Sequence, residues 1–287
     1  MQHRKVLISA DSTCDLGQEL KEKYEIRYFP FHILLGEGSY VDGKDITPEE
    51  IYKAWRSQKI LPKTAAITMM EYYEYFRSWV EQGYDVVHVN LGSAISSAHQ
   101  NCVAAANQLG HVYPVDSCSL STGRGHLVLK AAEWAREGKS AEEIQRELQK
   151  LTRSVRASFV LDTLEFMRAG GRCSAVTAFG ANLLHLRPCI EVDNQENGAM
   201  KVGKKYRGSM EKVLEQYVRG QLENREDLCL DRLFITHSGC PEEHIRLVRT
   251  LAEQLAPFRE IHVTQASCTI SSHCGPGTLG VLFLTEQ

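Results

Sequence analysis

The chain has 287 residues and a formal net charge of −3, with 43% hydrophobic and 24% charged residues, and its length favours two domains over one. The negative charge argues against nucleic-acid binding, and no apolar run approaches the roughly 20 residues that span a bilayer. The nine cysteines form no CxxC pair and the histidines no HxxxH pair, so we expect no metal site. Without a signal peptide, free thiols predict a cytoplasmic protein.

The chain opens with a strand, a polar turn and a helix, at residues 6–10, 11–15 and 16–24. This order is typical of the first unit of a doubly wound α/β domain. Asp11, Ser12 and Thr13 would then lie at the sheet edge where ligands bind in such folds. Helix capping is the competing role, and we favour it for Ser12 and Thr13.

Residues 26–35 predict a second strand, interrupted at Pro30, and a turn at residues 36–39 leads into a hairpin. A GxxxxGK match at residues 38–44 is rejected as a nucleotide site, because Asp45 replaces the Ser or Thr that holds magnesium. A capping box then begins a helix at Thr47.

Residues 61–68 are expected to be extended, because the residue before a proline avoids the α region. Thr64 in this segment, beside two alanines, either caps a helix or binds a ligand. An aromatic-rich helix is predicted over residues 69–81. At helical spacing its aromatic side chains indicate core packing rather than a cofactor site.

An apolar strand at residues 84–91 is followed by a turn with three serines and then by a helix at residues 103–109. Free N–H groups at a helix start favour an anion. Ser93, Ser96 and Ser97 therefore either cap the helix or line an anion site.

The remaining chain continues the α/β pattern. Strands are predicted at residues 111–117, 158–162, 188–192, 199–205, 232–236, 260–264 and 281–284, and helices at residues 126–137, 141–152, 164–169, 174–185, 209–223 and 241–256. Asn197-Gly198 is a strong hairpin signal between two of these strands. We expect an N-terminal domain of residues 1–156, with a mainly parallel sheet, and a C-terminal α/β domain of residues 157–287.

Two glycine-rich stretches lie in the second half. Gly170-Gly171 ends a helix, and Arg172 after it is either a surface residue or a guanidinium held near an anion. Residues 275–280 spell GxGxxG, but too few residues follow for a dinucleotide-binding unit. We interpret them as a turn that fixes His273.

Several segments together resemble the DegV family of bacterial fatty-acid-binding proteins. They are residues 11–16 (DSTCDL), 62–64 (PKT), 93–100 (SAISSAHQ), 116–117 (DS), 164–172 (LEFMRAGGR) and 273–280 (HCGPGTLG). The sequence departs from the family pattern after Thr64, where two alanines replace serine and glutamine, and after Ser96, where serine and alanine replace glycine and threonine.

The resemblance implies a two-domain DegV-like α/β fold that buries a long-chain fatty acid such as palmitate, with no further cofactor. It implies that Thr64, Ser96 and His273 contact the carboxylate and that Arg172 lies close by. Some family members present the acid to a fatty acid kinase, for which Arg207 is a candidate docking residue. The competing function is a serine-dependent acyl hydrolase with Ser96 as nucleophile and His273 as base, although no GxSxG elbow is present.

Overall fold

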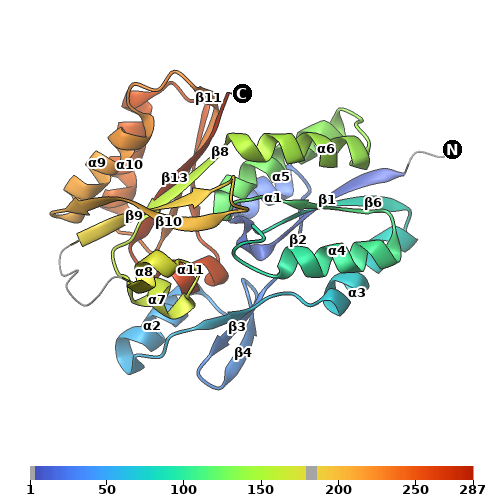
Figure 1. The fold of residues 1–287 in the computed structure, drawn as a ribbon, viewed down its shortest axis with the longest axis horizontal. Coiled ribbons are helices and arrows are strands. Elements are labelled where there is room, and N and C mark those ends of the chain that lie inside the picture. The colour runs from blue at the N-terminus through green and yellow to red at the C-terminus, as the bar shows by residue number, and fades with distance from the viewer. Residues whose placement is uncertain (1–3, 179–185, 287) are drawn as a thin grey trace.

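The computed structural model describes residues 4–178 and 186–286, and its N-terminal part is built on a parallel sheet (Figure 1). The order β2-β1-β6-β7 is parallel throughout, as predicted for a doubly wound domain. The strands are β1 (Lys5–Asp11), β2 (Arg27–Phe29), β6 (Tyr84–Asn90) and β7 (Val112–Asp116). The helices of this part are α1 (Gly17–Lys23), α3 (Met69–Glu81), α4 (Ala98–Leu109), α5 (Ser121–Arg136) and α6 (Ala141–Leu151).

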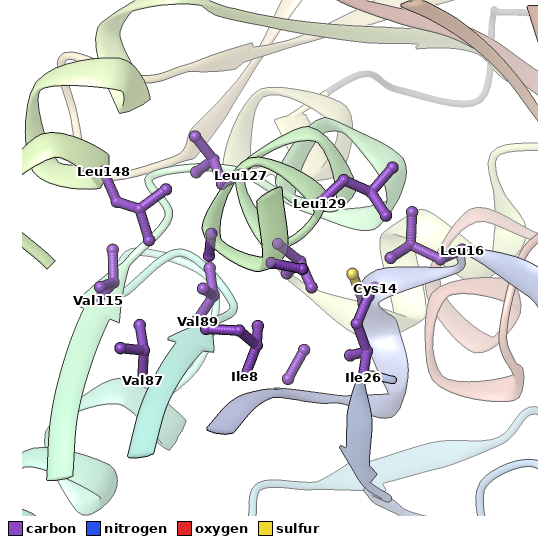
Figure 2. Packing of buried hydrophobic residues seen from close by; sticks show 14 of the residues in the cluster. Ile8, Cys14, Leu16, Ile26, Val87, Val89, Val115, Leu127, Leu129 and Leu148 are labelled. Carbon is purple, nitrogen blue, oxygen red and sulfur yellow. The ribbon is translucent and has the colours of Figure 1, made fainter. Parts of the chain in front are cut away.

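Alternation along the strands divides the core between the two faces of this sheet. Ile8 and Val87 pack with Leu127 of α5 on one face (Figure 2). Leu7 and Val86, one residue earlier on the same strands, pack against α3 and α4 on the other face. The sheet is therefore covered on both sides, as the apolar runs of its strands require.

A six-stranded sheet of order β10-β9-β8-β13-β11-β12 forms the second layer. All of its pairings are antiparallel except β11 with β12. Its outer face packs on α9 (Met210–Leu222) and α10 (Glu242–Leu255). The strands are β8 (Val155–Val160), β9 (Leu186–Asp193), β10 (Ala199–Arg207), β11 (Leu228–Ser238), β12 (Glu260–Gln265) and β13 (Thr278–Thr285).

Helix α5 lies between the two sheets, as Figure 1 shows. One hydrophobic cluster joins Leu127 of α5 to Ile8 of the parallel sheet and to Phe234 and Leu282 of the six-stranded sheet. The two layers therefore share a core. The division of the chain after residue 156 stays a prediction.

The segment predicted as one strand over residues 26–35 is instead two strands in different sheets. Pro30 has no N–H to donate, and the N–H of Phe31 donates to Ser12 Oγ at 3.0 Å instead of to a neighbouring strand. The chain therefore leaves the parallel sheet after β2. It enters a three-stranded antiparallel sheet of β3 (His32–Leu35), β4 (Gly38–Val41) and β5 (Lys63–Ala65). Helix α2 (Pro48–Gln58) lies between β4 and β5 in the sequence.

The remaining short helices are α7 (Glu165–Gly170), α8 (Ser174–Ala178) and α11 (Cys268–Cys274), together with two single-turn 3-10 helices at Ser12–Cys14 and Thr152–Ser154. The predicted helix at residues 174–185 extends outside the described residues. His273 lies in the last turn of α11, where the sequence suggested only a glycine-rich turn. Within residues 4–178 and 186–286, no helix combines the length and apolar character needed to cross a bilayer.

Candidate functional site

A cavity of about 390 Å³ opens between the β6–α4 turn, β5, α11 and the inner face of the six-stranded sheet. Thr64, Ser96, Arg172 and His273 all line it. Four predicted site residues from distant parts of the chain are therefore brought together. Arg207 is not among the lining residues and lies exposed at the end of β10.

Thr64 and His273 form the centre of the polar end. Thr64 Oγ1 lies 2.8 Å from Nε2 of His273, although 209 residues separate them in sequence. Thr64 is held in β5, where it pairs with Ile33 of β3. The pair fixes the β5 edge of the cavity against helix α11.

Helix α11 is held at its start by carboxylates from the first fifty residues. Asp42 accepts hydrogen bonds from the backbone N–H groups of Cys268 and Thr269, at 2.9 and 3.1 Å. Asp15 accepts one from the N–H of Ser267 at 2.9 Å. These contacts satisfy donors that a helix start leaves open, and they set where the helix places His273.

The imidazole of His273 is held in one orientation. Its Nδ1 atom is buried and has no hydrogen-bond partner within the described residues. A Cβ atom on Gly170 would collide with Nδ1, so the Cα–H of Gly170 points at this nitrogen. A ring N–H would clash there, whereas a lone pair accepts a weak C–H contact. We therefore assign the proton to Nε2, which donates to Thr64 and leaves the Thr64 hydroxyl proton for a ligand.

His273 is held in its neutral form. Burial lowers the pKa of His273 to about 4, and the nearby positive charge of Arg172 acts in the same direction. At neutral pH the ring therefore acts as a polar hydrogen-bond donor and carries no charge. The positive charge available at this end of the cavity is that of Arg172.

Arg172 connects the two walls of the polar end. It follows Gly171, whose φ of +67° is in the left-handed region that favours glycine. Its Nη1 donates to the carbonyl oxygen of Gly170 at 2.6 Å. Its Nε reaches the carbonyl oxygen of Ile95 in the serine turn at 3.5 Å. The side chain is exposed, so solvent screens its charge.

The serine turn gives its three serines different roles. Ser96 is half-buried, and its Oγ accepts the N–H of Ala98 at 3.2 Å, which leaves its hydroxyl proton unused within the described residues. Ser97 is the residue before α4 but makes no side-chain cap. The N–H of Ser93 donates to Asp116 at 3.2 Å. Ser96 therefore contributes both to the start of α4 and to the cavity.

A buried ion pair beneath this turn was not foreseen from the sequence. Asp11 and Arg124 are both fully buried, and the two Nη atoms of Arg124 donate to the carboxylate at 2.6 and 2.8 Å. Arg124 keeps the pKa of Asp11 below its usual value against the opposing effect of burial, which is the larger single influence. The pair ties α5 to β1. Asp11 and Thr13 therefore stabilise the fold through Arg124. The hydroxyl of Ser12 donates to Asp42 at 2.9 Å.

The geometry offers little for nucleophilic catalysis. Nε2 of His273 is engaged by Thr64, and within the described residues neither a carboxylate orients Nδ1 nor a hydrogen bond joins His273 to Ser96. Both contacts are typical of a base that activates a serine nucleophile. The part of the chain that the structure covers also has no cluster of His, Cys, Asp and Glu residues that could hold a metal ion.

Comparison with known proteins gives matches over nearly the whole chain. The model of the DegV family, described as uncharacterised proteins, matches residues 5–286. A DegV domain-containing protein of Caldanaerobacter subterraneus is 30% identical over 282 residues, which cover 97% of this chain and 98% of the relative. The structure of a DegV family protein from Thermus thermophilus, described by its fatty acid binding, matches with a TM-score of 0.86 and 30% identity over 98% of this chain and 99% of the other. DegV of Bacillus subtilis, described as a fatty acid binding protein, matches with a TM-score of 0.80 and 25% identity over 99% and 100%.

Proposed function

The chain belongs to the DegV family, and on that premise we propose that it binds a long-chain fatty acid (C14–C18), with the carboxylate held by Thr64, Ser96 and His273. The observation that supports this proposal is that all three residues line one cavity, with Thr64 Oγ1 2.8 Å from Nε2 of His273. Arg172 lines the same cavity and supplies the opposite charge. The fatty acid binding described for the Thermus thermophilus and Bacillus subtilis proteins supports the same ligand class.

The two ends of a fatty acid would contribute differently. A C16 chain has about 14 methylenes, and at ~0.8 kcal/mol each their burial yields about 11 kcal/mol before the cost of association is subtracted. A buried carboxylate is unfavourable unless hydrogen bonds replace its water. The hydroxyls of Thr64 and Ser96, each with a proton not used elsewhere, supply such bonds. The tail thus provides affinity and the polar end provides orientation.

Titration of delipidated protein with palmitate and with methyl palmitate tests this proposal. We expect palmitate to bind with saturable 1:1 stoichiometry, and the methyl ester, which has the same tail but no negative charge, to bind at least tenfold more weakly. Equal affinity for the two ligands would contradict a carboxylate site at Thr64 and His273.

The hydrolase alternative makes a different prediction. Ser96 and His273 line the same cavity, so an acyl ester could reach both side chains. A lipid-binding protein releases no p-nitrophenol from p-nitrophenyl palmitate beyond the rate of its Ser96→Ala variant. Turnover that depends on Ser96 would favour the hydrolase.

We further propose that the bound acid is presented to a fatty acid kinase subunit in the cytoplasm, a reducing compartment that suits a sequence with nine cysteines and no CxxC pair. Arg207 is exposed at the end of the edge strand β10, and no carboxylate pairs with it among residues 4–178 and 186–286. An Arg207→Ala variant is expected to bind palmitate normally and to support less acyl phosphate formation by a bacterial fatty acid kinase. Unchanged phosphorylation would exclude Arg207 from docking.

A further inference from the structure

The inner part of the cavity is more polar than a hydrocarbon chain requires. Apart from Thr64 and Ser96, which are half-buried, six buried hydroxyl-bearing residues line the cavity, and we call the part that they line its inner part: Ser121, Ser158, Thr236, Ser238, Thr269 and Thr278. A wall that only encloses methylenes gains nothing from hydroxyl groups, because each polar atom loses water when the chain enters. The bonding of these hydroxyls indicates what they can still accept or donate.

Five of the six hydroxyls donate their protons inside the protein. Ser121 donates to Asp15, Thr269 to Asp42, Thr278 to the carbonyl of Cys274 and Ser238 to Ser271. The hydroxyl of Tyr217 donates to the carbonyl of Ser158, so the hydroxyl of Ser158 is the donor in its contact with Tyr217. A hydroxyl oxygen has two lone pairs. Above about pH 7, where Asp15 is ionised, these side chains therefore offer acceptor oxygens and no donor.

Thr236 is the exception. Its Oγ1 lies 2.6 Å from that of Thr122 and 3.0 Å from that of Thr264. Thr122 and Thr264 have no other side-chain hydroxyl partner among the described residues, so three hydroxyls share two hydrogen bonds. Either partner can donate in each bond, and when both outer hydroxyls donate to Thr236, both hydrogen bonds are kept and the two lone pairs of Thr236 are used. The proton of Thr236, the one of the three that lines the cavity, is then left over.

We propose that the inner part of the cavity recognises a hydroxyl group on the acyl chain, so that the preferred ligand is a hydroxylated long-chain fatty acid. A hydroxyl group both accepts and donates. It can accept the proton of Thr236 and donate to one of the acceptor oxygens beside it, whereas a methylene leaves both unsatisfied. This inference rests on the proposed function, because it assumes that the carboxylate lies at Thr64 and His273.

The position of helix α11 indicates which part of the acyl chain would carry the hydroxyl group. The N–H of Ala266, just before the helix, donates to the carbonyl of His237, which places Ala266 beside the residue that follows Thr236 on β11. The seven residues from Ala266 to His273 span about 10 Å at the helical rise. The substituent is therefore expected near the middle of an acyl chain and away from the carbon next to the carboxylate.

The test compares stearate with 2-, 10- and 12-hydroxystearate by calorimetric titration of delipidated protein. We expect the 10- or 12-hydroxy acid to bind roughly two- to tenfold more tightly than stearate, the gain of one net hydrogen bond, and the 2-hydroxy acid to show no such gain. Thr236→Val, which keeps the side-chain shape, is expected to abolish the preference while stearate still binds. Thr236→Ser, which keeps the hydroxyl, is expected to retain it.

The outcomes separate this inference from the proposed function. If stearate binds as tightly as every hydroxylated isomer in the wild-type protein, the inference is overturned and the proposed function stands. A preference that survives in Thr236→Val would overturn the assignment to Thr236. If none of the four acids binds, the proposed function fails and the inference fails with it. The wild-type series decides the main point even if Thr236→Val does not fold.

Discussion

Replacement of Thr64 by valine removes one hydroxyl from the polar end of the cavity and keeps the β-branched shape that suits strand β5. Thr64 Oγ1 lies 2.8 Å from Nε2 of His273, and with the proton of His273 assigned to Nε2 this hydroxyl accepts it and keeps its own proton for the ligand. The variant therefore loses a hydrogen bond to a charged group and leaves Nε2–H short of an acceptor. We expect palmitate affinity to fall by ~1–3 kcal/mol, or roughly 5- to 150-fold.

Calorimetric titration of delipidated wild-type protein, Thr64→Val, Thr64→Ser and Thr64→Ala measures this effect. Thr64→Ser, which retains the hydroxyl, serves as the matched control and is expected to bind within a few-fold of wild type. Thr64→Ala is expected to behave like valine. Thermal melting of each variant separates a local loss from general unfolding. If Thr64→Val bound palmitate as tightly as Thr64→Ser, the hydrogen-bond chain from His273 through Thr64 to the carboxylate would be refuted.

Three other substitutions test the surroundings of the site. Ser96→Ala is expected to weaken palmitate binding by ~1–3 kcal/mol in the same titration, and unchanged affinity would remove Ser96 from the carboxylate site. Gly170→Ala adds a methyl group that collides with Nδ1 of His273, so we expect weaker binding and a destabilisation of ~1–3 kcal/mol; a normal melting temperature and normal binding would contradict the packing. Burial raises the pKa of Asp15 from 3.8 to about 7. Between these two pH values the folded protein keeps the Asp15 proton and the unfolded chain releases it, so the contribution of Asp15 to the free energy of unfolding decreases as the pH rises toward 7. Asp15→Asn stays neutral, and its melting temperature relative to wild type should increase from about pH 4 to pH 7 and then level off; a constant difference would contradict the raised pKa.

Local sequence signals predicted much of the framework. The capping boxes at Thr47 and Ser140 both form, because the carboxylate three residues later is within reach of the cap in any helix that starts there. The hairpin at Asn197-Gly198 forms for a similar reason, since both residues adopt the positive φ that such a turn needs. Strand β1 and the strands beside it followed from apolar runs between polar turns.

The three-stranded sheet of β3, β4 and β5 and helix α11 could not be predicted from local sequence signals. Helix α11 starts where Asp42 accepts the N–H of Cys268, and 226 residues separate the two. The strand over residues 26–35 divides because Phe31 donates to Ser12 instead of to a neighbouring strand. Both outcomes depend on contacts between distant parts of the chain, which no local pattern contains.

Local sequence signals likewise indicated only some residues of the candidate site. Ser96 could be identified as an anion-binding candidate from its place between a strand and a helix. The placement of Thr64 and His273 at one site has no local signal, and it was expected only because the segments around these residues resemble those of a known family; their direct hydrogen-bond contact was not expected. The hydroxyl cluster around Thr236 was not expected at all, since Thr122, Thr236 and Thr264 lie on three separate elements.

The most direct test of fatty-acid binding is to identify what the protein carries after purification from a bacterial host. Organic extraction of the folded protein, followed by mass spectrometry, measures the amount and identity of any bound lipid. We predict about one long-chain fatty acid of the C14–C18 range per chain in the wild-type protein, and markedly less in a Thr64→Val, Ser96→Ala double variant. Wild-type protein that is folded, is free of fatty acid and does not take up palmitate afterwards would contradict the central claim.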